Sequence, residues 1–434
     1  MALGGGTFVT QNKVLAGSYI NFVSASNASA VLSDRGIATI ALDMDWGIES
    51  EVFEVTREEF YANSLKHFGY PYDHEKMKGL RDLFKNIKTL YAYRLNTNGA
   101  KATNVYASAK HIGARGNDLK VSFKPNIDNS SLVDVKTLFD DVVVDAQTVA
   151  TRDELKDNSF VTWGEFELSS GMDVEEVLDG GTNGEVKNAN HQAYLDAIES
   201  YSFNTMGAMT SDATIKSLYT SFTKRMRDEI GAKFQLVLHN HAADYEGVVN
   251  VKNTVQGTQT DALVYWVTGV IAGCEINKSN LNKVYDGEFT VNAQYTQTQL
   301  MQAIKDGEFV LHRVGRDLRV LDDINSLVTI TPEKDEIFKD NQTIRVIDQI
   351  ANDIAVIFNE KYLGAVPNDA AGRTSLWADI VKHHEELEAI RAIEDFNEED
   401  VVIAQGDSKK SVVVTDAVTV VNAMAKLYMT VTVA

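Results

Sequence analysis

Side chains that could bind a metal ion are concentrated between Leu238 and Asp244. His239 and His241 are two residues apart after an apolar run, so on an extended strand they point to the same side. Asp244 could complete a zinc site with them. No second cluster of His, Cys or Glu with ligand spacing accompanies this pair. Polar histidines at a strand exit are the favoured interpretation, and a metal-dependent hydrolase using His239, His241 and Asp244 is the alternative.

Other possible reactive groups are weaker. The Gly180–Gly184 loop is glycine-rich but lacks the lysine of a phosphate-binding loop. His383–Glu386 lies in a helical pattern, where neighbouring residues point in different directions, so we expect a solvated face. Cys274 ends an apolar segment and is expected to be a buried hydrophobic residue. No GxSxG pattern is present. The sequence therefore predicts a protein that is not an enzyme and has no cofactor and no metal.

Composition narrows the class of protein further. The 434 residues carry a formal net charge of −21, which argues against a nucleic acid partner because phosphates are bound by clustered Lys and Arg. No apolar run approaches the roughly 20 residues of a membrane span, and the N-terminal sequence does not resemble a signal peptide. The single cysteine suits a reducing compartment. We expect synthesis in a cytoplasm and no direct insertion into a membrane.

The elements that would position these residues form a mixed α/β (α+β) pattern. Apolar periodicity predicts helices near residues 194–201, 215–226, 261–273, 344–358 and 376–390. Short β-type runs are expected at 90–95, 234–238, 309–312, 318–321, 401–403 and 412–414. Between residues 96 and 184 helical periodicity is weak, and short β-type runs alternate with turns of Asn, Asp, Gly and Ser. This segment is predicted to be a mostly-β insert.

Both ends of the chain have the pattern of strands. Gly17–Val23 is a short strand-like run, and the last residues alternate apolar and polar side chains. One face of that C-terminal run consists of Leu427, Met429, Val431 and Val433, and the other of Tyr428, Thr430 and Thr432. Chain ends fray unless they are paired, so each end needs a sheet edge in its own chain or in a neighbour. The pattern favours a protein that assembles with copies of itself.

Several motifs, in order and spacing, resemble those of contractile phage tail sheath proteins, a family that includes the sheaths of R-type bacteriocins. The similar segments span nearly the whole chain: Leu15–Phe22, Ala107–Asp118, Leu178–Gly184, Asn341–Gly364 and Ala423–Met429. Two residues depart from the family pattern. Ala16 stands where proline is usual, which leaves the start of the N-terminal arm less rigid, and His111 stands where tyrosine is common.

The resemblance implies a structural subunit that forms a helical tube around a tail tube and contracts to drive that tube through a cell envelope. It implies a linking arm at 1–25, a conserved core at 26–95 and 185–410, an outward-facing β insert at 96–184 and a second linking arm at 411–434. Expected partners are other copies of the chain, the tail tube protein, and baseplate and tail-terminator or collar proteins. The particle would assemble in the host or producer cytoplasm and end as a virion tail or a released bacteriocin.

The resemblance also implies particular contact residues. Inter-subunit pairing is expected at Tyr19, Ile20, Phe22, Leu427, Met429, Val431 and Val433. Cations near the two C-terminal helices, Lys361, Arg373 and Lys382, are candidates for contact with the tail tube. The alternative for these three, solvated charges at helix ends, is equally favoured because exposed ion pairs contribute little.

Overall fold

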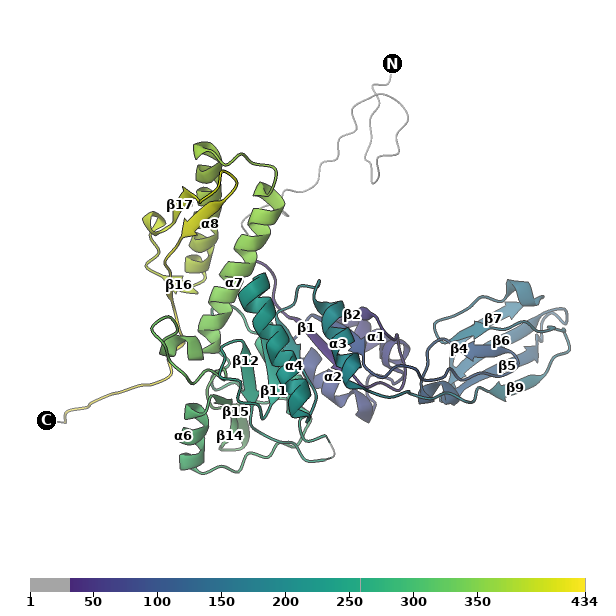
Figure 1. Cartoon of the computed structure of the whole chain (residues 1–434). Helices are drawn as coiled ribbons and strands as arrows, with labels where there is room; N and C mark the ends of the chain where they lie inside the picture. The colour runs from purple at the N-terminus through teal and green to yellow at the C-terminus, as the bar shows by residue number, and fades with distance from the viewer. Residues whose placement is uncertain (1–31, 258, 434) are drawn as a thin grey trace, which may run out of the picture. The chain divides into compact units, whose positions relative to one another are not determined.

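The computed structural model describes residues 32–257 and 259–433 and confirms the mixed α/β class (Figure 1). The chain divides into two compact units. The larger unit contains Asp34–Gln349 and the C-terminal segment from Val421, and the smaller contains Ile350–Val420 with Ser33. The predicted linking residues Tyr19, Ile20 and Phe22 lie outside the described residues.

A seven-stranded sheet forms the centre of the larger unit. Its strand order is β13-β12-β11-β10-β1-β3-β2, and all neighbouring pairs are parallel except the antiparallel pair β2 and β3. Side chains alternate between its two faces, as the pleat requires. In β11, for example, Val237 packs into one apolar cluster while Leu236 and Leu238 pack into the other. The strands are β1 (Ile37–Leu42), β2 (Val52–Thr56), β3 (Thr89–Arg94), β10 (Thr205–Gly207), β11 (Gln235–His239), β12 (Val248–Val251) and β13 (Glu308–Phe309).

Helices cover both faces of this sheet, which gives a three-layer arrangement. One cluster includes side chains of α1 (Arg57–Phe68), α2 (Lys78–Phe84) and α5 (Leu263–Gly273). The opposite cluster includes α3 (Asn188–Ile198) and α4 (Ala213–Lys224), which Figure 1 shows in front of the strands. The side chains of α5 from Leu263 to Ala272 are all buried, so this apolar helix lies within the core, as its sequence predicts.

The remaining elements of the larger unit attach to this layered core. They are α6 (Gln297–Lys305), the antiparallel pair β14 (Leu311–Val314) and β15 (Asp317–Val320), and the first part of α7 (Asn341–Ile357). A buried ion pair holds α7, because Arg227 Nη1 lies 2.6 Å from Asp348 Oδ2. Residue Arg227 lies in the π-helical turn Arg225–Ile230 that follows α4.

The predicted insert is β structure, whereas its exact boundaries stay predictions. A four-stranded antiparallel sheet has the order β7-β6-β5-β9, and β4 pairs with β8 beside it. Aromatic and aliphatic side chains from these strands share one cluster with Trp46 of the core. The strands are β4 (Ala107–Ala109), β5 (Leu119–Pro125), β6 (Val133–Phe139), β7 (Val142–Val149), β8 (Val161–Trp163) and β9 (Val174–Val177).

Two sequence motifs meet where the insert begins and ends. Asn117 and Gly181 exchange two hydrogen bonds, of 2.7 and 3.0 Å, so the start of the insert is tied to its closing loop. The Asn183 carbonyl accepts from Asn96, and its amide donates to Asp45 of the core. His111, in the position where the family pattern has tyrosine, also packs edge-on against Trp46 with ring centroids 5.1 Å apart. The motifs thus have a structural role in fastening the insert.

The smaller unit has its own apolar cluster. The unit consists of the end of α7, the π-helical turn Phe358–Tyr362, α8 (Ala370–Ala389) and two antiparallel strand pairs. The strands are β16 (Ile393–Glu394) with β19 (Thr419–Val420), and β17 (Val402–Gln405) with β18 (Val412–Thr415). Leu376 and Ile380 of α8 pack with Val401, beside β17. The two predicted C-terminal helices and the final strand pair are confirmed.

Replacement of Gly113 by alanine is expected to loosen the junction of the insert. Gly113 has φ +132°, and a Cβ atom there would lie 1.9 Å from the Asp45 carbonyl oxygen, so the backbone must move. We expect a loss of at least about 1–3 kcal/mol in the free energy of unfolding, from backbone strain. Urea titration would measure it. The matched control is Gly171→Ala in the same insert, because a Cβ at Gly171 meets nothing within 4 Å; equal effects of both substitutions would contradict the argument.

Candidate functional site

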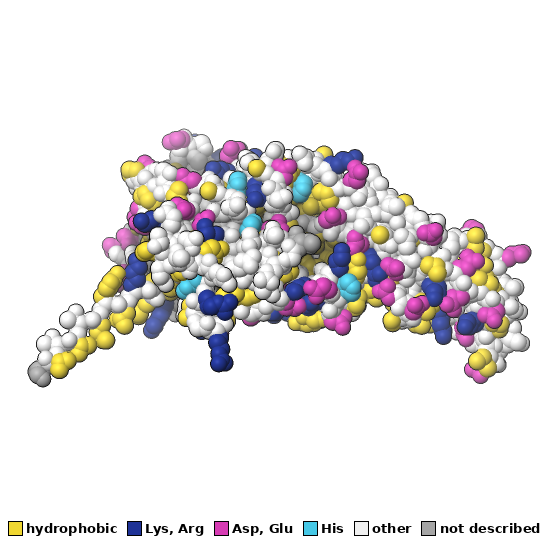
Figure 2. Space-filling view, turned by 90° about the horizontal axis from the view of Figure 1, so that it is seen from below, with side chains coloured by type: hydrophobic (Ala, Val, Ile, Leu, Met, Phe, Trp, Pro, Cys, Tyr) yellow, Lys and Arg dark blue, Asp and Glu magenta, His cyan; other side chains and the backbone are white. Residues whose placement is uncertain are grey.

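The C-terminal segment is extended and exposed. Backbone and side-chain hydrogen bonds to Gln342 and Thr343 of α7 hold residues Val421–Ala423, with distances of 3.0–3.2 Å. Beyond them, residues 424–433 form no strand within the described chain. Leu427 is 86% exposed and Val433 is 89% exposed, and Figure 2 shows hydrophobic side chains along this segment. An apolar strand pattern without a partner in its own chain is a candidate for pairing with another copy.

The β17–β18 pair offers sheet edges for such pairing. These two strands form a sheet of their own, and their outer edges pair with no other strand among the described residues. Val402, Val413 and Val414 are also exposed. Open edges and exposed β-branched side chains favour the addition of a further strand.

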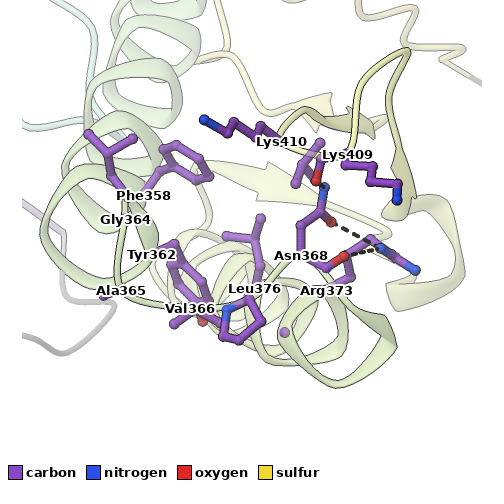
Figure 3. Close-up of a pocket in the computed structure, with 14 residues that line it drawn as sticks. Phe358, Tyr362, Gly364, Ala365, Val366, Asn368, Arg373, Leu376, Lys409 and Lys410 are labelled. Atoms are coloured by element: carbon purple, nitrogen blue, oxygen red, sulfur yellow. Dashed lines mark hydrogen bonds between the residues drawn. The ribbon is translucent and has the colours of Figure 1, made fainter.

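A cavity of about 570 Å³ lies beside this pair, between the π-helical turn after α7 and the β17–β18 turn (Figure 3). Its walls are mainly apolar, with three cations among them: Arg373, Lys409 and Lys410. Asn368 organises the rim, since it donates to the carbonyls of Lys409 and Ser411 and accepts from Arg373 at 2.9 Å. The two lysines were not among the predicted site residues, although adjacent lysines in a turn of so acidic a chain were a usable signal.

The three cations predicted to contact a tail tube differ in the contacts that they make. Lys361 Nζ lies 2.6 Å from Asp379 Oδ2, and this attraction raises the pKa of Lys361. Arg373 bonds to Asn368 in the cavity wall. Lys382 is exposed on α8 and forms no ion pair with any described residue. Lys382 is therefore the cation most available to an external partner, and the contacts themselves stay predictions.

The residues of the alternative metal site make other contacts. Asp244 accepts hydrogen bonds from the Val328 and Thr329 amides at 2.7 and 2.8 Å and from the Thr329 hydroxyl at 2.5 Å. His241 lies 3.1 Å from the Thr220 hydroxyl, whereas His239 Nε2 is buried without a hydrogen bond partner. Burial lowers the pKa of both imidazoles and so keeps them neutral. In the described part of the chain, no group of three His, Cys, Asp or Glu residues could hold a metal ion.

The prediction for His383 and His384 was wrong, whereas that for Cys274 is confirmed. Both imidazoles are fully buried and face carboxylates, instead of lying on a solvated face. Adjacent helical residues point in different directions, yet here packing encloses both. Cys274 is buried, and burial raises the pKa of its thiol.

None of the helices in residues 32–257 and 259–433 is long and apolar enough to cross a membrane.

Four family descriptions match consecutive parts of the chain. Residues 35–95 match the N-terminal region of domain III of the tail sheath protein Gp18, and 96–183 match the phage tail sheath protein beta-sandwich domain. Residues 184–326 match the phage tail sheath protein central domain, and 333–434 match the phage tail sheath C-terminal domain. The matches together account for nearly all of the chain.

Individual proteins agree with these matches. The phage-like element PBSX protein XkdK of Bacillus subtilis (strain 168) is 31% identical, with 99% of each chain covered. The crystal structure of the sheath tail protein from Desulfitobacterium hafniense is 34% identical, has a TM-score of 0.77, and covers 90% of this chain and 93% of its own. The helical sheath protein of the anti-feeding prophage in its contracted state is 12% identical with a TM-score of 0.59, covering 97% and 99%, which shows a common fold.

Zinc is expected not to bind at His239 and His241 with one-to-one stoichiometry. Asp244 is engaged by three hydrogen bonds, so two histidines remain, which is fewer than the three protein ligands of a catalytic zinc site. Titration calorimetry with zinc chloride would measure the stoichiometry. A one-to-one binding event that is lost in His239→Ala but retained in His312→Ala would instead support the hydrolase alternative.

Proposed function

The chain belongs to the family of phage tail sheath proteins, and we propose that its copies join by strand exchange into a contractile helical tube. Its structural role in a tail sheath follows from the family. The proposal concerns how that role is performed, and the exposed apolar C-terminal segment is the observation that carries it.

Backbone pairing would supply the links between copies. In this arrangement the strand pattern of residues 427–433 adds to an edge of the β17–β18 pair in a neighbouring copy, and the N-terminal arm with Tyr19, Ile20 and Phe22 adds in the same way. Each hydrogen bond contributes only about 1 kcal/mol net. Several bonds per arm, repeated over many copies, give a cooperative lattice. Because a head-to-tail contact need not close on itself, the lattice can extend as an open helix.

Contraction would be a change between two packings of this lattice. The fold shared with the contracted sheath of the anti-feeding prophage supports such a change. The arms would keep copies joined while the compact units rotate. Energy stored at assembly would drive the change, which agrees with the sequence having no phosphate-binding loop motif.

The remaining partners follow from the same proposal. The inner surface would contact a tail tube protein through cations near α8, with Lys382 the most available. Baseplate and tail-terminator or collar proteins would bind the two ends of the tube. Assembly would take place in the host or producer cytoplasm, before the particle acts outside that cell. Like the family as a whole, the proposed role is structural and not enzymatic.

Deletion of Leu427–Ala434 is expected to give a folded chain that forms no tubes. The described part of this segment is exposed, so its removal costs the single chain little stability but removes the pairing strand. Negative-stain electron microscopy and size-exclusion chromatography would measure tube formation, and circular dichroism would measure folding. Normal tubes from the deleted chain would refute strand exchange at this end.

A pair of full-length variants tests the side-chain pattern of the same segment. Replacement of Leu427, Met429, Val431 and Val433 by serine should weaken tube formation, because these residues share one face of the strand. Replacement of Tyr428, Thr430 and Thr432 by serine is the control and should have the smaller effect.

Charge reversal at Lys382 is expected to weaken binding to the tail tube protein at low salt. Its ammonium group forms no ion pair in the described chain, whereas that of Lys361 is paired with Asp379. The Lys382→Glu variant should therefore lose more affinity than Lys361→Glu in a co-sedimentation assay with preformed tubes. The difference should shrink in high salt, because exposed charges are screened. Equal binding by wild type and Lys382→Glu would exclude this residue from the contact.

A further inference from the structure

A series of four side chains, with two buried histidines at its centre, is joined by short polar contacts in the smaller unit. His383 Nε2 lies 3.0 Å from Asp353 Oδ2, and His384 Nε2 lies 2.6 Å from Asp416 Oδ2. Between them, the Nδ1 atoms of the two imidazoles are 3.1 Å apart. Both histidines have zero exposed area, so water does not reach their rings, whereas the Asp416 side chain is 24% exposed. The series Asp353–His383–His384–Asp416 is called the buried histidine chain below.

The number of protons in this chain follows from its geometry. Each of the three contacts joins two atoms that can accept, so each needs one hydrogen to become a hydrogen bond. Two neutral imidazoles carry two hydrogens in total. With both carboxylates ionised, the third hydrogen makes the histidine pair cationic by one unit. A series in which all three contacts are hydrogen bonds thus holds one proton more than two neutral histidines do.

Any other proton count breaks one of the three contacts. Without the extra proton, two hydrogens serve three contacts, so two acceptors face each other at one of them. With a further proton, two N–H groups face each other across the 3.1 Å between the Nδ1 atoms. Both arrangements leave buried polar atoms without a partner, which costs more than an ordinary hydrogen bond contributes. The intact series therefore exists only at this one proton count, between the states with one proton fewer and one proton more.

The surroundings favour one positive charge in this position. Facing the pair are Asp353 from α7 and Asp416 from the segment after β18, and the Phe396 ring lies 5.2 Å from that of His384. Other charged side chains nearby in sequence are exposed or half-buried. These are exposed Lys382 and Glu385 and half-buried Glu386 on α8, exposed Glu394 on β16 and exposed Asp395 after it, and half-buried Glu388, which accepts from the Phe396 amide.

The outer residues of the buried histidine chain contact or belong to segments near the bases of the predicted arms, because Asp353 contacts Ser33 and Asp416 lies within the predicted C-terminal arm. Ser33, which follows the N-terminal arm in sequence, donates its hydroxyl to Asp353 Oδ1 at 2.6 Å. Asp416 lies between β18 and β19, a few residues before the exposed C-terminal segment. We propose that His383 and His384 share one extra proton, and that this proton couples the base of the N-terminal arm to the base of the C-terminal arm. The coupling is a property of the single chain, and its use in a tube rests on the proposed function.

The first test is the pH dependence of stability, measured on dilute full-length chain. Thermal unfolding of wild type and His383→Gln would be compared from pH 5 to pH 9. A glutamine amide can donate to His384 without an extra proton. The melting temperature of wild type minus that of the variant should be largest at an intermediate pH and smaller at both lower and higher pH. The control is His312→Gln in β14, whose difference from wild type should show no such maximum.

Two results would overturn the shared proton. One is a difference between wild type and His383→Gln that is flat or changes in one direction only. The other is one equivalent of zinc in the purified chain that is lost in His383→Gln, since a metal would then join the two Nδ1 atoms.

The second test addresses the coupling at constant pH. In Asp416→Asn, amide hydrogen exchange of the peptide containing Ser33 should become about fivefold faster, the factor for one ordinary hydrogen bond. The control is Asp407→Asn, in the exposed β17–β18 turn. Faster exchange confined to residues next to the substituted position would show that the bases of the two arms are independent. Both tests use the unassembled chain, so a failure of strand exchange would leave their outcome unchanged.

Discussion

An extended strand carries backbone donors and acceptors along both edges, and it is stable only when they find partners. Residues 424–433 have the side-chain pattern of a strand and no strand partner in the described chain. Water can satisfy the polar backbone groups, but the apolar side remains exposed. In the proposed assembly, neighbouring copies supply the strand partner that the chain's own described sheets do not. The open edges of β17 and β18 are the complementary feature.

The rest of the architecture separates rigid parts from linking parts. The central sheet is covered by helices on both faces, and buried Arg227 and Asp348 fix α7 to it. Breaking such a buried pair is costly, since it leaves an uncompensated charge. Residues 427–433, the described segment proposed to join copies, are exposed and not part of these packed layers. In the proposed contraction, copies built in this way would change position without repacking their cores.

Sequence reasoning succeeded where the signal is local and repeated. The apolar helix α5, the paired strands β17 and β18, and the β insert all follow from periodicity that packing reinforces. It failed at His383 and His384, because their burial depends on Asp353 and Asp416, which are about 30 residues away in either direction. The same limit applies to Lys361: no local pattern showed that Asp379 would neutralise it. Side-chain partners distant in sequence are the information that periodicity lacks.

The order of strands in the central sheet has a consequence for biosynthesis. β1 pairs with β3 on one side and with β10 on the other, yet β3 ends at Arg94 and β10 begins at Thr205. The ribosome must therefore deliver the whole β insert before the middle of the sheet can close. Two of the insert's four strand pairs, β5–β6 and β6–β7, join neighbours in sequence, and such pairs form faster than distant ones. The insert can thus fold before β10 has been synthesised, while β1 still has one unpaired edge. The nascent chain is most vulnerable to aggregation during that interval.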